Sequence, residues 1–206
     1  VCQCNTAGTI VHLAIDGKYA GHIVLGDVVK PTSKDAISDL HKSGITQTIM
    51  LTGDTRSVAE QTANELGIDK VFSELLPNDK VNQLENILGY AKEDNKVAFV
   101  GDGINDAPAL ISAHVGISMS RGADIAKATA DISLLKDDIA AVVESKEYAN
   151  KTMNLINNNF NATVGINSAI LAGATFGVFS PIVTAVLHNG TTIGLLLNSI
   201  KGVNIK

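Results

Sequence analysis

The chain has 206 residues, a formal net charge of −5 at pH 7 and 45% hydrophobic residues. This acidic balance, with no basic cluster to offset it, argues against a nucleic-acid-binding protein. Its two cysteines, Cys2 and Cys4, are too few for a disulfide framework. We expect free thiols in a reducing compartment, with a soft-metal Cys-x-Cys site as the alternative. The chain begins with Val1 rather than Met, and we expect it to be a fragment.

The predicted elements begin with two strands over 9–25, joined by a turn at Asp16-Gly17. A helix follows over 33–43, with Ser33 as its N-cap and Gly44 closing it. Strands and helices then alternate, with strands at 47–51, 70–72, 96–100, 115–119 and 132–135 and helices at 55–66, 80–91, 107–112 and 124–130. This alternation predicts βαβ units, and therefore an α/β fold with a doubly wound parallel sheet.

A helix over 138–157 leads to a stretch, from residue 157 to residue 200, that contains no Asp, Glu, Lys or Arg. Its two runs, 161–179 and 181–200, are each close to the ~20 residues that span ~30 Å of hydrocarbon as a helix. Lysines flank the pair on both sides, which favours a cytoplasmic location for both ends. We expect a two-helix transmembrane hairpin. A buried helical hairpin in a soluble protein is the alternative.

The most specific stretch runs from Gly101 to Leu110, reads GDGINDAPAL, and follows the strand predicted at 96–100. Ligands bind at the carboxyl ends of strands in open α/β sheets. Asp102 and Asp106 can both point at one hard cation there, and Mg²⁺ needs few protein carboxylates. We therefore predict a magnesium site. The alternative is an acidic turn that merely caps the next helix.

Two further motifs stand beside predicted strands or helices. Thr52-Gly53-Asp54 closes the strand at 47–51, where a backbone N–H and a hydroxyl can bind phosphate oxygens. Lys80 opens the helix at 80–91, where a compact cation can neutralise a phosphoryl group. Each alone could be structural, as a turn or a solvated helix start. In this order, and together with the acid pair, they predict a phosphoryl-transfer site, although no aspartate is placed as its nucleophile.

These motifs resemble the hallmark motifs of P-type ATPases, whose phosphorylation domain has the haloacid-dehalogenase fold. The resemblance covers essentially the whole chain as the C-terminal part of such a pump. It implies the end of a nucleotide-binding domain over 1–25, a phosphorylation domain over 26–145, and a linker helix with the last two membrane helices over 146–206. A chain that ends two membrane spans after the phosphorylation domain resembles the heavy-metal branch of this family, of the cadmium/zinc/cobalt type.

The resemblance also implies residue roles. Thr52 and Lys80 would contact the aspartyl phosphate, and Asp102 and Asp106 would hold Mg²⁺. The remaining positions that match the family's motifs are Gly53 and Asp54 in the conserved loop, Asn105 at the phosphate or magnesium shell, and Asp27 and Lys30 in the return from the nucleotide-binding domain. The family's Asp-Lys-Thr-Gly-Thr motif is absent and would lie upstream, so we expect the fragment alone to be inactive.

The second uncharged run contains His188, an ionisable group in a predicted membrane span and therefore a functional candidate. His188, Thr191 and Thr192 fall on one helical face. The segment resembles the His-Glu-Gly-Gly-Thr motif of the cobalt/zinc/iron-type pumps, with Asn189 in place of the Glu. Imidazole suits zinc, cobalt, nickel and iron, and we expect a divalent cation rather than copper(I). A histidine packed and hydrogen-bonded between helices is the alternative.

Together these expectations describe part of an ATP-driven pump for a divalent cation of the Zn/Cd/Co type. ATP would be its substrate and Mg²⁺ its cofactor. Its partners would be the metal ion, the lipid bilayer and the upstream part of the same polypeptide. We expect a multi-pass protein of the plasma membrane with a cytoplasmic catalytic domain. The alternatives are a soluble phosphatase of the same superfamily and a non-catalytic module that binds phosphate and Mg²⁺.

Overall fold

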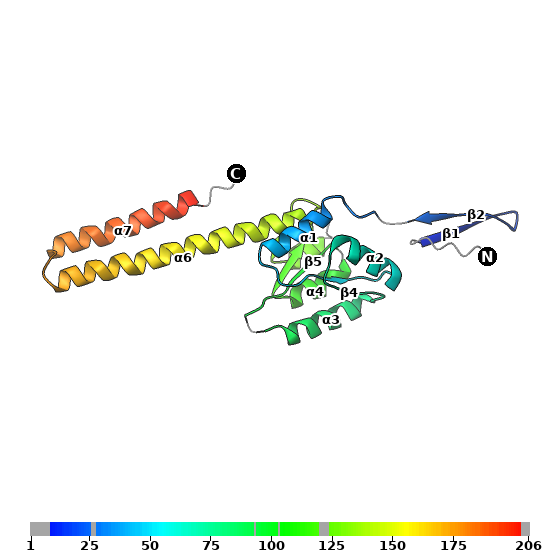
Figure 1. The fold of residues 1–206 in the computed structure, drawn as a ribbon, viewed down its shortest axis with the longest axis horizontal. Coiled ribbons are helices and arrows are strands. Elements are labelled where there is room, and N and C mark those ends of the chain that lie inside the picture. The colour runs from blue at the N-terminus through cyan, green and yellow to red at the C-terminus, as the bar shows by residue number, and fades with distance from the viewer. Residues whose placement is uncertain (1–8, 26–27, 93, 103, 120–123, 203–206) are drawn as a thin grey trace. The chain divides into compact units, whose positions relative to one another are not determined.

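The computed structural model describes residues 9–25, 28–92, 94–102, 104–119 and 124–202. Cys2, Cys4, Asp27 and Gly103 therefore lie outside the described residues. The chain forms two compact units, Val1–Glu144 and Ser145–Lys206. The main helices and strands of each unit are labelled in Figure 1.

The first unit begins with an antiparallel hairpin of β1 (Thr9–Ile15) and β2 (Lys18–Leu25). The two turn residues, Asp16 and Gly17, both have positive φ, of 50° and 73°. A two-residue turn of this hand matches the twist of the flanking strands, which is why Asp-Gly favours a hairpin. The predicted hairpin is therefore confirmed. The pairing is regular except for a bulge between Leu13 and Ala14.

The remainder of this unit alternates short strands with helices, as predicted. Its helices are α1 (Ser33–Lys42), α2 (Arg56–Leu66), α3 (Pro77–Tyr90), the short 3₁₀ helix η1 (Ile104–Asp106), α4 (Ala107–Ser112), α5 (Asp124–Thr129) and the start of α6 (Ala140–Thr175). Its strands are β3 (Ile49–Leu51), β4 (Lys70–Phe72), β5 (Ala98–Gly101), β6 (Val115–Ser118) and β7 (Ile132–Ser133). Every strand pair here is parallel, in agreement with the α/β prediction.

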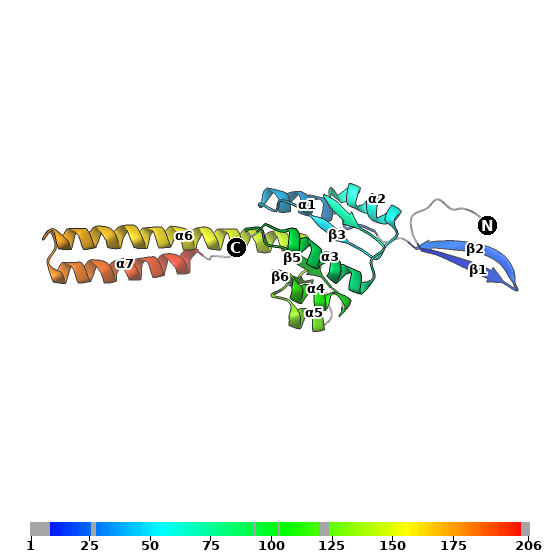
Figure 2. The same ribbon diagram turned by 90° about the horizontal axis from the view of Figure 1, so that it is seen from below.

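The prediction of one continuous sheet needs a correction. After the hairpin, the described strands form two parallel sheets, β3–β4 and β5–β6–β7. Strands β3, β5 and β6 are labelled in Figure 2. Among the described residues, β3 pairs only with β4 and β5 only with β6. In the part of the chain that the structure describes, β3 and β5 therefore each have one edge without a ladder partner, and no strand joins the two sheets.

Several element boundaries differ from prediction by a few residues, and two of these differences have a clear local reason. Helix α3 begins at Pro77 rather than at Lys80, because proline is favoured in the first turn and the Asp79 carboxylate accepts the Leu76 N–H at 3.0 Å. Helix α6 runs without a break through most of the first uncharged run, 161–179, and ends at Thr175. Gly177, at a φ of 73°, then provides the left-handed residue that stops the chain from continuing as a helix.

The core of the first unit forms where α1, β6 and the start of α6 meet. Ala36, Ile37 and Leu40 share one face of α1, at helical spacing, and are buried against Ile117 of β6. Leu134 and the helix residues Ala141, Val142 and Val143 complete this cluster. On another side, α3 packs on α4, and the fully buried side chains Leu84 and Leu110 come from these two helices.

The second unit is a helical hairpin made of α6, from residue 145 onward, and α7 (Pro181–Gly202). The two helices run side by side in Figure 1 and in Figure 2. Polar side chains join the two helices. The amide nitrogen of Asn159 donates to Ser199 Oγ at 2.7 Å, and that of Asn198 donates to Asn159 Oδ1 at 2.8 Å. The runs predicted at 161–179 and 181–200 are thus found as two packed helices.

Their expected role as membrane spans is not confirmed. Within the described residues, no helix has both the length and the apolar content that crossing a bilayer requires.

Candidate active site

The central feature of the first unit is an ion pair between residues far apart in sequence. Because α3 begins at Pro77, Lys80 lies in its first turn, while Asp106 ends η1 immediately before α4. The Lys80 ammonium donates to Asp106 Oδ1 at 3.1 Å. Asp106 is only 8% exposed, and a carboxylate so buried requires a cation or hydrogen-bond donors around it. The structure therefore brings two of the predicted site residues into direct contact.

Asp106 also packs against the end of strand β5. A Cβ added to Gly101 would lie 2.8 Å from Asp106 Cβ and 3.1 Å from Asp106 Oδ2, so only glycine permits this approach. Asp102 follows directly after Gly101 and is exposed. Two carboxylates at one strand end, one buried and one exposed, supply hard oxygen ligands of the kind Mg²⁺ takes alongside its waters. The residues present fit the predicted cation.

The Thr52-Gly53-Asp54 loop has its own internal bonding. The Thr52 hydroxyl donates to Asp54 Oδ2 at 2.8 Å and accepts the Asp54 N–H at 3.1 Å. Backbone bonds join this loop to the segment after β4: Leu75 N donates to Thr52 O at 3.1 Å, and Glu74 N donates to Asp54 O at 2.9 Å. The loop is thereby fixed to the segment that leads directly into α3.

That segment connects the two halves of the site. It contacts Thr52 and Asp54 on one side, and its continuation places Lys80 in the first turn of α3. In the part of the chain that the structure describes, neither Thr52 nor Asp54 forms a hydrogen bond or ion pair with Lys80 or Asp106. The site consists of two pairs, Thr52–Asp54 and Lys80–Asp106, held by one shared segment.

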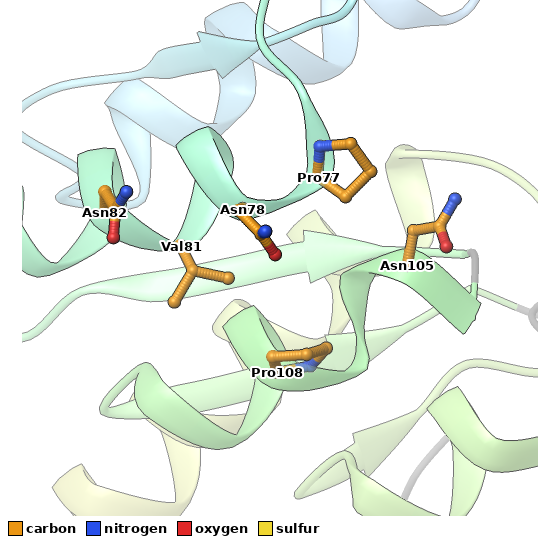
Figure 3. Close-up of a pocket in the computed structure, with 6 residues that line it drawn as sticks. All are labelled: Pro77, Asn78, Val81, Asn82, Asn105 and Pro108. Carbon is orange, nitrogen blue, oxygen red and sulfur yellow. The ribbon is translucent and has the colours of Figure 1, made fainter.

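Asn105 is exposed and borders a cleft of about 410 Å³ (Figure 3). The cleft lies between the start of α3 and the η1–α4 segment, and its lining residues are Pro77, Asn78, Val81, Asn82, Asn105 and Pro108. Two of these, Asn78 and Asn82, were not expected from the sequence. The sequence feature that could have indicated them is their spacing of four residues on α3, since residues at i and i+4 share one face of a helix.

In the second unit, His188 Nδ1 lies 3.0 Å from Asn167 Oδ1, a hydrogen bond between α7 and α6. Asn167 was also missed by the sequence analysis, because nothing local links residues on two different helices. The hydroxyls of Thr191 and Thr192 donate to the carbonyls of Leu187 and His188, four residues back on their own helix. Of the predicted ion ligands on α7, only His188 thus bonds across the helix pair through its side chain.

Within the described residues, the two carboxyls with clearly displaced pKa values are not among these site residues. The backbone N–H and hydroxyl of Thr48 hold the pKa of Asp69 below its ordinary range. The Ala140 N–H, assisted by the Thr32 hydroxyl, does the same for the pKa of Asp138. In both cases the carboxylate accepts hydrogen bonds, which favour its ionised form.

Within the described residues, no cluster of three or more His, Cys, Asp or Glu side chains is arranged to hold a metal ion. The predicted magnesium site would therefore depend on the two carboxylates beside β5 alone.

Comparisons with known proteins give a consistent result. The sequence model described as "haloacid dehalogenase-like hydrolase" matches residues 2–114, just over half of the chain. The zinc-transporting ATPase of Synechocystis sp. is 43% identical over 176 residues, which are 85% of this chain and 24% of that protein. The cadmium, zinc and cobalt-transporting ATPase of Bacillus subtilis is 37% identical over 203 residues, covering 98% of this chain and 29% of its own length.

A solved structure also matches both units. The crystal structure of a zinc-transporting PIB-type ATPase in its E2.Pi state has a TM-score of 0.82 and 31% sequence identity, and covers 95% of this chain and 31% of its own. The resemblance to heavy-metal P-type ATPases expected from the motifs is thus confirmed over most of the chain. The chain spans about a quarter of the length of the curated relatives it matches.

Proposed function

We propose, on the premise that this chain belongs to the haloacid dehalogenase-like hydrolase family, that it forms part of an ATP-driven pump for a divalent heavy-metal cation. The relatives transport zinc, or cadmium, zinc and cobalt, and are about three and a half times as long as this chain. The reaction would proceed through an aspartyl phosphate whose aspartate lies in the upstream part of the polypeptide. This chain would then supply the pocket that binds the phosphoryl group.

The observation that carries this proposal is the Lys80–Asp106 pair beside the end of β5. A lysine held in place before the reaction can neutralise phosphoryl oxygens without reorganising in the transition state. Asp102 and Asp106 would hold Mg²⁺, which when bound supplies further neutralisation of the phosphate charge. Asp106 thus fixes the lysine and contributes to the cation site, and Asn105 lies next to it at the edge of the cleft.

The Thr52 loop would bind the phosphoryl group from another side. Its hydroxyl is oriented by Asp54 and its backbone by the bonds to the segment before α3. Asp54, exposed beside that hydroxyl, would position the water that later attacks the aspartyl phosphate. A Cβ on Gly53 would lie 3.3 Å from the Leu75 carbonyl oxygen, so the loop has little room for a side chain there.

The strand that carries the nucleophile would come from elsewhere in the polypeptide. Strands β3 and β5, which precede Thr52 and Asp102, each leave one edge without a ladder partner among the described residues. An unpaired edge strand is a template for another strand. A strand paired there would place its own carboxyl end beside the residues that bind phosphate and cation, which supports assembly of the site with the upstream part.

The domain organisation we propose is the end of a nucleotide-binding domain over 1–25, a phosphorylation domain over 26–145, and a membrane part over 146–206. The boundary between the two compact units at residue 144 supports it. The absence of charged residues from 157 to 200 supports a bilayer location for the helix pair. So do its exposed apolar side chains, among them Phe160, Leu171, Phe176, Ile182 and Leu196. The catalytic domain would then be cytoplasmic, at the plasma membrane.

The transported ion would bind near His188. Its hydrogen bond with Asn167 places an imidazole and an amide oxygen together between the two helices. These ligand types suit a borderline divalent cation better than a hard one. Thr191 and Thr192, on the same face of α7, would contribute oxygen atoms.

The test uses the complete pump in inverted membrane vesicles, with Asp106→Asn. This substitution keeps the shape of the side chain but removes the charge that pairs with Lys80 and would bind Mg²⁺. We expect ATP-dependent uptake of Zn²⁺, Cd²⁺ or Co²⁺ to fall at least about 100-fold, the size typical of losing one group that stabilises transition-state charge. Uptake of radiolabelled metal and phosphorylation by ATP are measured together.

The matched control is Asp94→Asn, a change of the same size at an exposed carboxylate in the loop before β5. It should leave uptake unchanged. Full activity of Asp106→Asn would refute the proposed site. Phosphate and Mg²⁺ binding without any metal-stimulated hydrolysis in the unmodified pump would instead favour a non-catalytic module.

A further inference from the structure

Three ring side chains gather on one face of the β1–β2 hairpin, apart from every residue used above. His12 and His22 are direct partners in the antiparallel ladder, and their ring centroids are 6.2 Å apart. The Tyr19 ring lies 6.0 Å from the His12 ring, centroid to centroid. Tyr19 Oη is 2.9 Å from His22 Nδ1. Two imidazoles and a phenol are therefore adjacent.

The bulge in the hairpin is what puts the three rings on one face. Leu13 pairs with Gly21 and Ala14 with Tyr19, which leaves Ala20 as an extra residue in β2. Side chains alternate between faces along a strand, so residues three apart, such as Tyr19 and His22, ordinarily point to opposite sides. One inserted residue cancels that difference. Gly21, at a φ of 155°, permits the backbone to adopt this irregularity.

We propose that His12 and His22 form a binding site for one divalent transition-metal ion, such as Ni²⁺, Cu²⁺ or Zn²⁺, with water at its remaining positions. Imidazole nitrogen is the preferred side-chain ligand for these ions. With a metal–nitrogen distance of about 2.0–2.1 Å, two imidazoles on one ion have ring centroids roughly 5–6 Å apart. The present separation of 6.2 Å is close to that range, and a small rotation of the exposed His12 side chain toward the half-buried His22 closes the difference.

Tyr19 acts as a positioning residue in this site. A histidine that binds a metal usually donates its other ring N–H to an oxygen, which fixes the tautomer and the ring orientation. The Tyr19 oxygen is placed to accept from His22 Nδ1, so that His22 binds the ion through Nε2. A loss of this hydrogen bond weakens the site without removing a ligand.

The site is independent of the proposed pump activity, because it uses no residue of the phosphate pocket or of the helix pair. It has two protein ligands, consistent with the absence of any cluster of three His, Cys, Asp or Glu side chains among the described residues. A metal held by two imidazoles and by water exchanges readily. The hairpin would therefore bind metal in proportion to its free concentration.

The experiment titrates the full 206-residue chain, purified without a histidine tag, with Ni²⁺ in competition with a chromophoric chelator. All variants carry His188→Ala, Cys2→Ser and Cys4→Ser, so that neither the helix pair nor the two thiols contribute a ligand, and the buffer contains excess Mg²⁺ to occupy carboxylate sites. We expect one Ni²⁺ per chain. His12→Ala and His22→Ala should each weaken binding at least about tenfold, because each converts a chelate into a single contact.

The double variant distinguishes chelation from two separate sites. If both imidazoles hold one ion, the double variant binds little more weakly than either single variant, since the two losses are not additive. Tyr19→Phe should keep the stoichiometry and weaken binding by up to about tenfold. The matched control His41→Ala should change nothing. Unchanged affinity in His12→Ala and His22→Ala, or two ions lost independently, would overturn the proposal.

Discussion

At the scale of single residues, the site depends on contacts that a side chain of a different size or charge cannot reproduce. Asp106 is held between the Lys80 ammonium and the bare backbone of Gly101. Lys80 is 25% exposed and Asp106 11% exposed at their side chains, so water screens this pair less than a surface ion pair. The two residues are best regarded as one unit, since removal of either leaves the other without its counter-charge.

A second close approach gives a prediction about stability. Gly116 lies in β6, and a Cβ there would overlap the Leu110 carbonyl oxygen on α4. Because the obstacle is backbone, it cannot move aside cheaply. Gly116→Ala should lower the free energy of unfolding by about 1–3 kcal/mol. Gly89→Ala, in α3 with no atom within 4 Å of the new Cβ, should raise it by about 0.5–1 kcal/mol. Urea denaturation of both variants checks the prediction, and equal stability of the two would contradict it.

At the scale of elements, the start of α6 is fixed by hydrogen bonds to a segment distant in sequence. The Asp138 carboxylate accepts the Ala140 N–H at 2.9 Å, which caps the helix, and the Thr32 hydroxyl at 2.9 Å. Lys30 donates to the Asp137 carboxylate at 2.9 Å and also to the Asp137 carbonyl. The segment before α1 and the loop before α6 are thus joined twice, beside the core where these helices pack.

This cap predicts a pH dependence. The Ala140 N–H, then the Thr32 hydroxyl, lower the pKa of Asp138 below its ordinary value of 3.8. A carboxyl with a lower pKa in the folded than in the unfolded chain stabilises the fold above the unfolded value. That contribution is lost as the pH falls through the folded value. The difference in unfolding free energy between the unmodified protein and Asp138→Asn should be constant from about pH 7 to 5 and shrink below about pH 4.

Urea denaturation at a series of pH values measures this difference. Thr32→Val removes one of the two hydrogen-bond donors to Asp138, and it should reduce the part of this free-energy difference that depends on pH. A difference between the unmodified protein and Asp138→Asn that stays the same down to pH 3 would contradict the assignment.

At the scale of the whole molecule, the two units carry different chemistry. The first holds the Lys80–Asp106 pair and the Thr52 loop, and the second holds the His188–Asn167 hydrogen bond. In a pump, ion binding in one unit must change the reactivity of the other. The proposed function therefore requires that a substitution at His188 alters a reaction carried out by residues of the first unit.

The corresponding prediction separates ion binding from phosphate chemistry. In the complete pump, His188→Ala should lower metal-stimulated ATP hydrolysis at least about tenfold, because an ion ligand is lost. Phosphorylation from inorganic phosphate with Mg²⁺, which needs no transported ion, should be retained. Asn189→Ala, the neighbouring residue on α7, is the control. Loss of both activities in His188→Ala would indicate a structural role for the histidine instead.

Much of this molecule was predictable from patterns a few residues long. Asp16-Gly17 predicted a hairpin, the spacing of Ala36, Ile37 and Leu40 predicted α1, and strand–helix alternation predicted the parallel α/β arrangement. These features follow from backbone geometry and periodicity, which are local properties. The motifs around Thr52, Lys80 and Asp106 were found for the same reason, and their resemblance to heavy-metal ATPases is confirmed by the relatives.

The sequence by itself thus determined the elements, the family resemblance and the residues that could carry chemistry. Only the tertiary structure decided which of those residues meet. Lys80 contacts Asp106, His188 bonds to Asn167, and β3 pairs with β4 but not with β5. Each depends on the packing of distant segments, which no local period encodes. The bulge at Ala20 shows the same limit at short range, because one extra residue reverses the face on which Tyr19 lies.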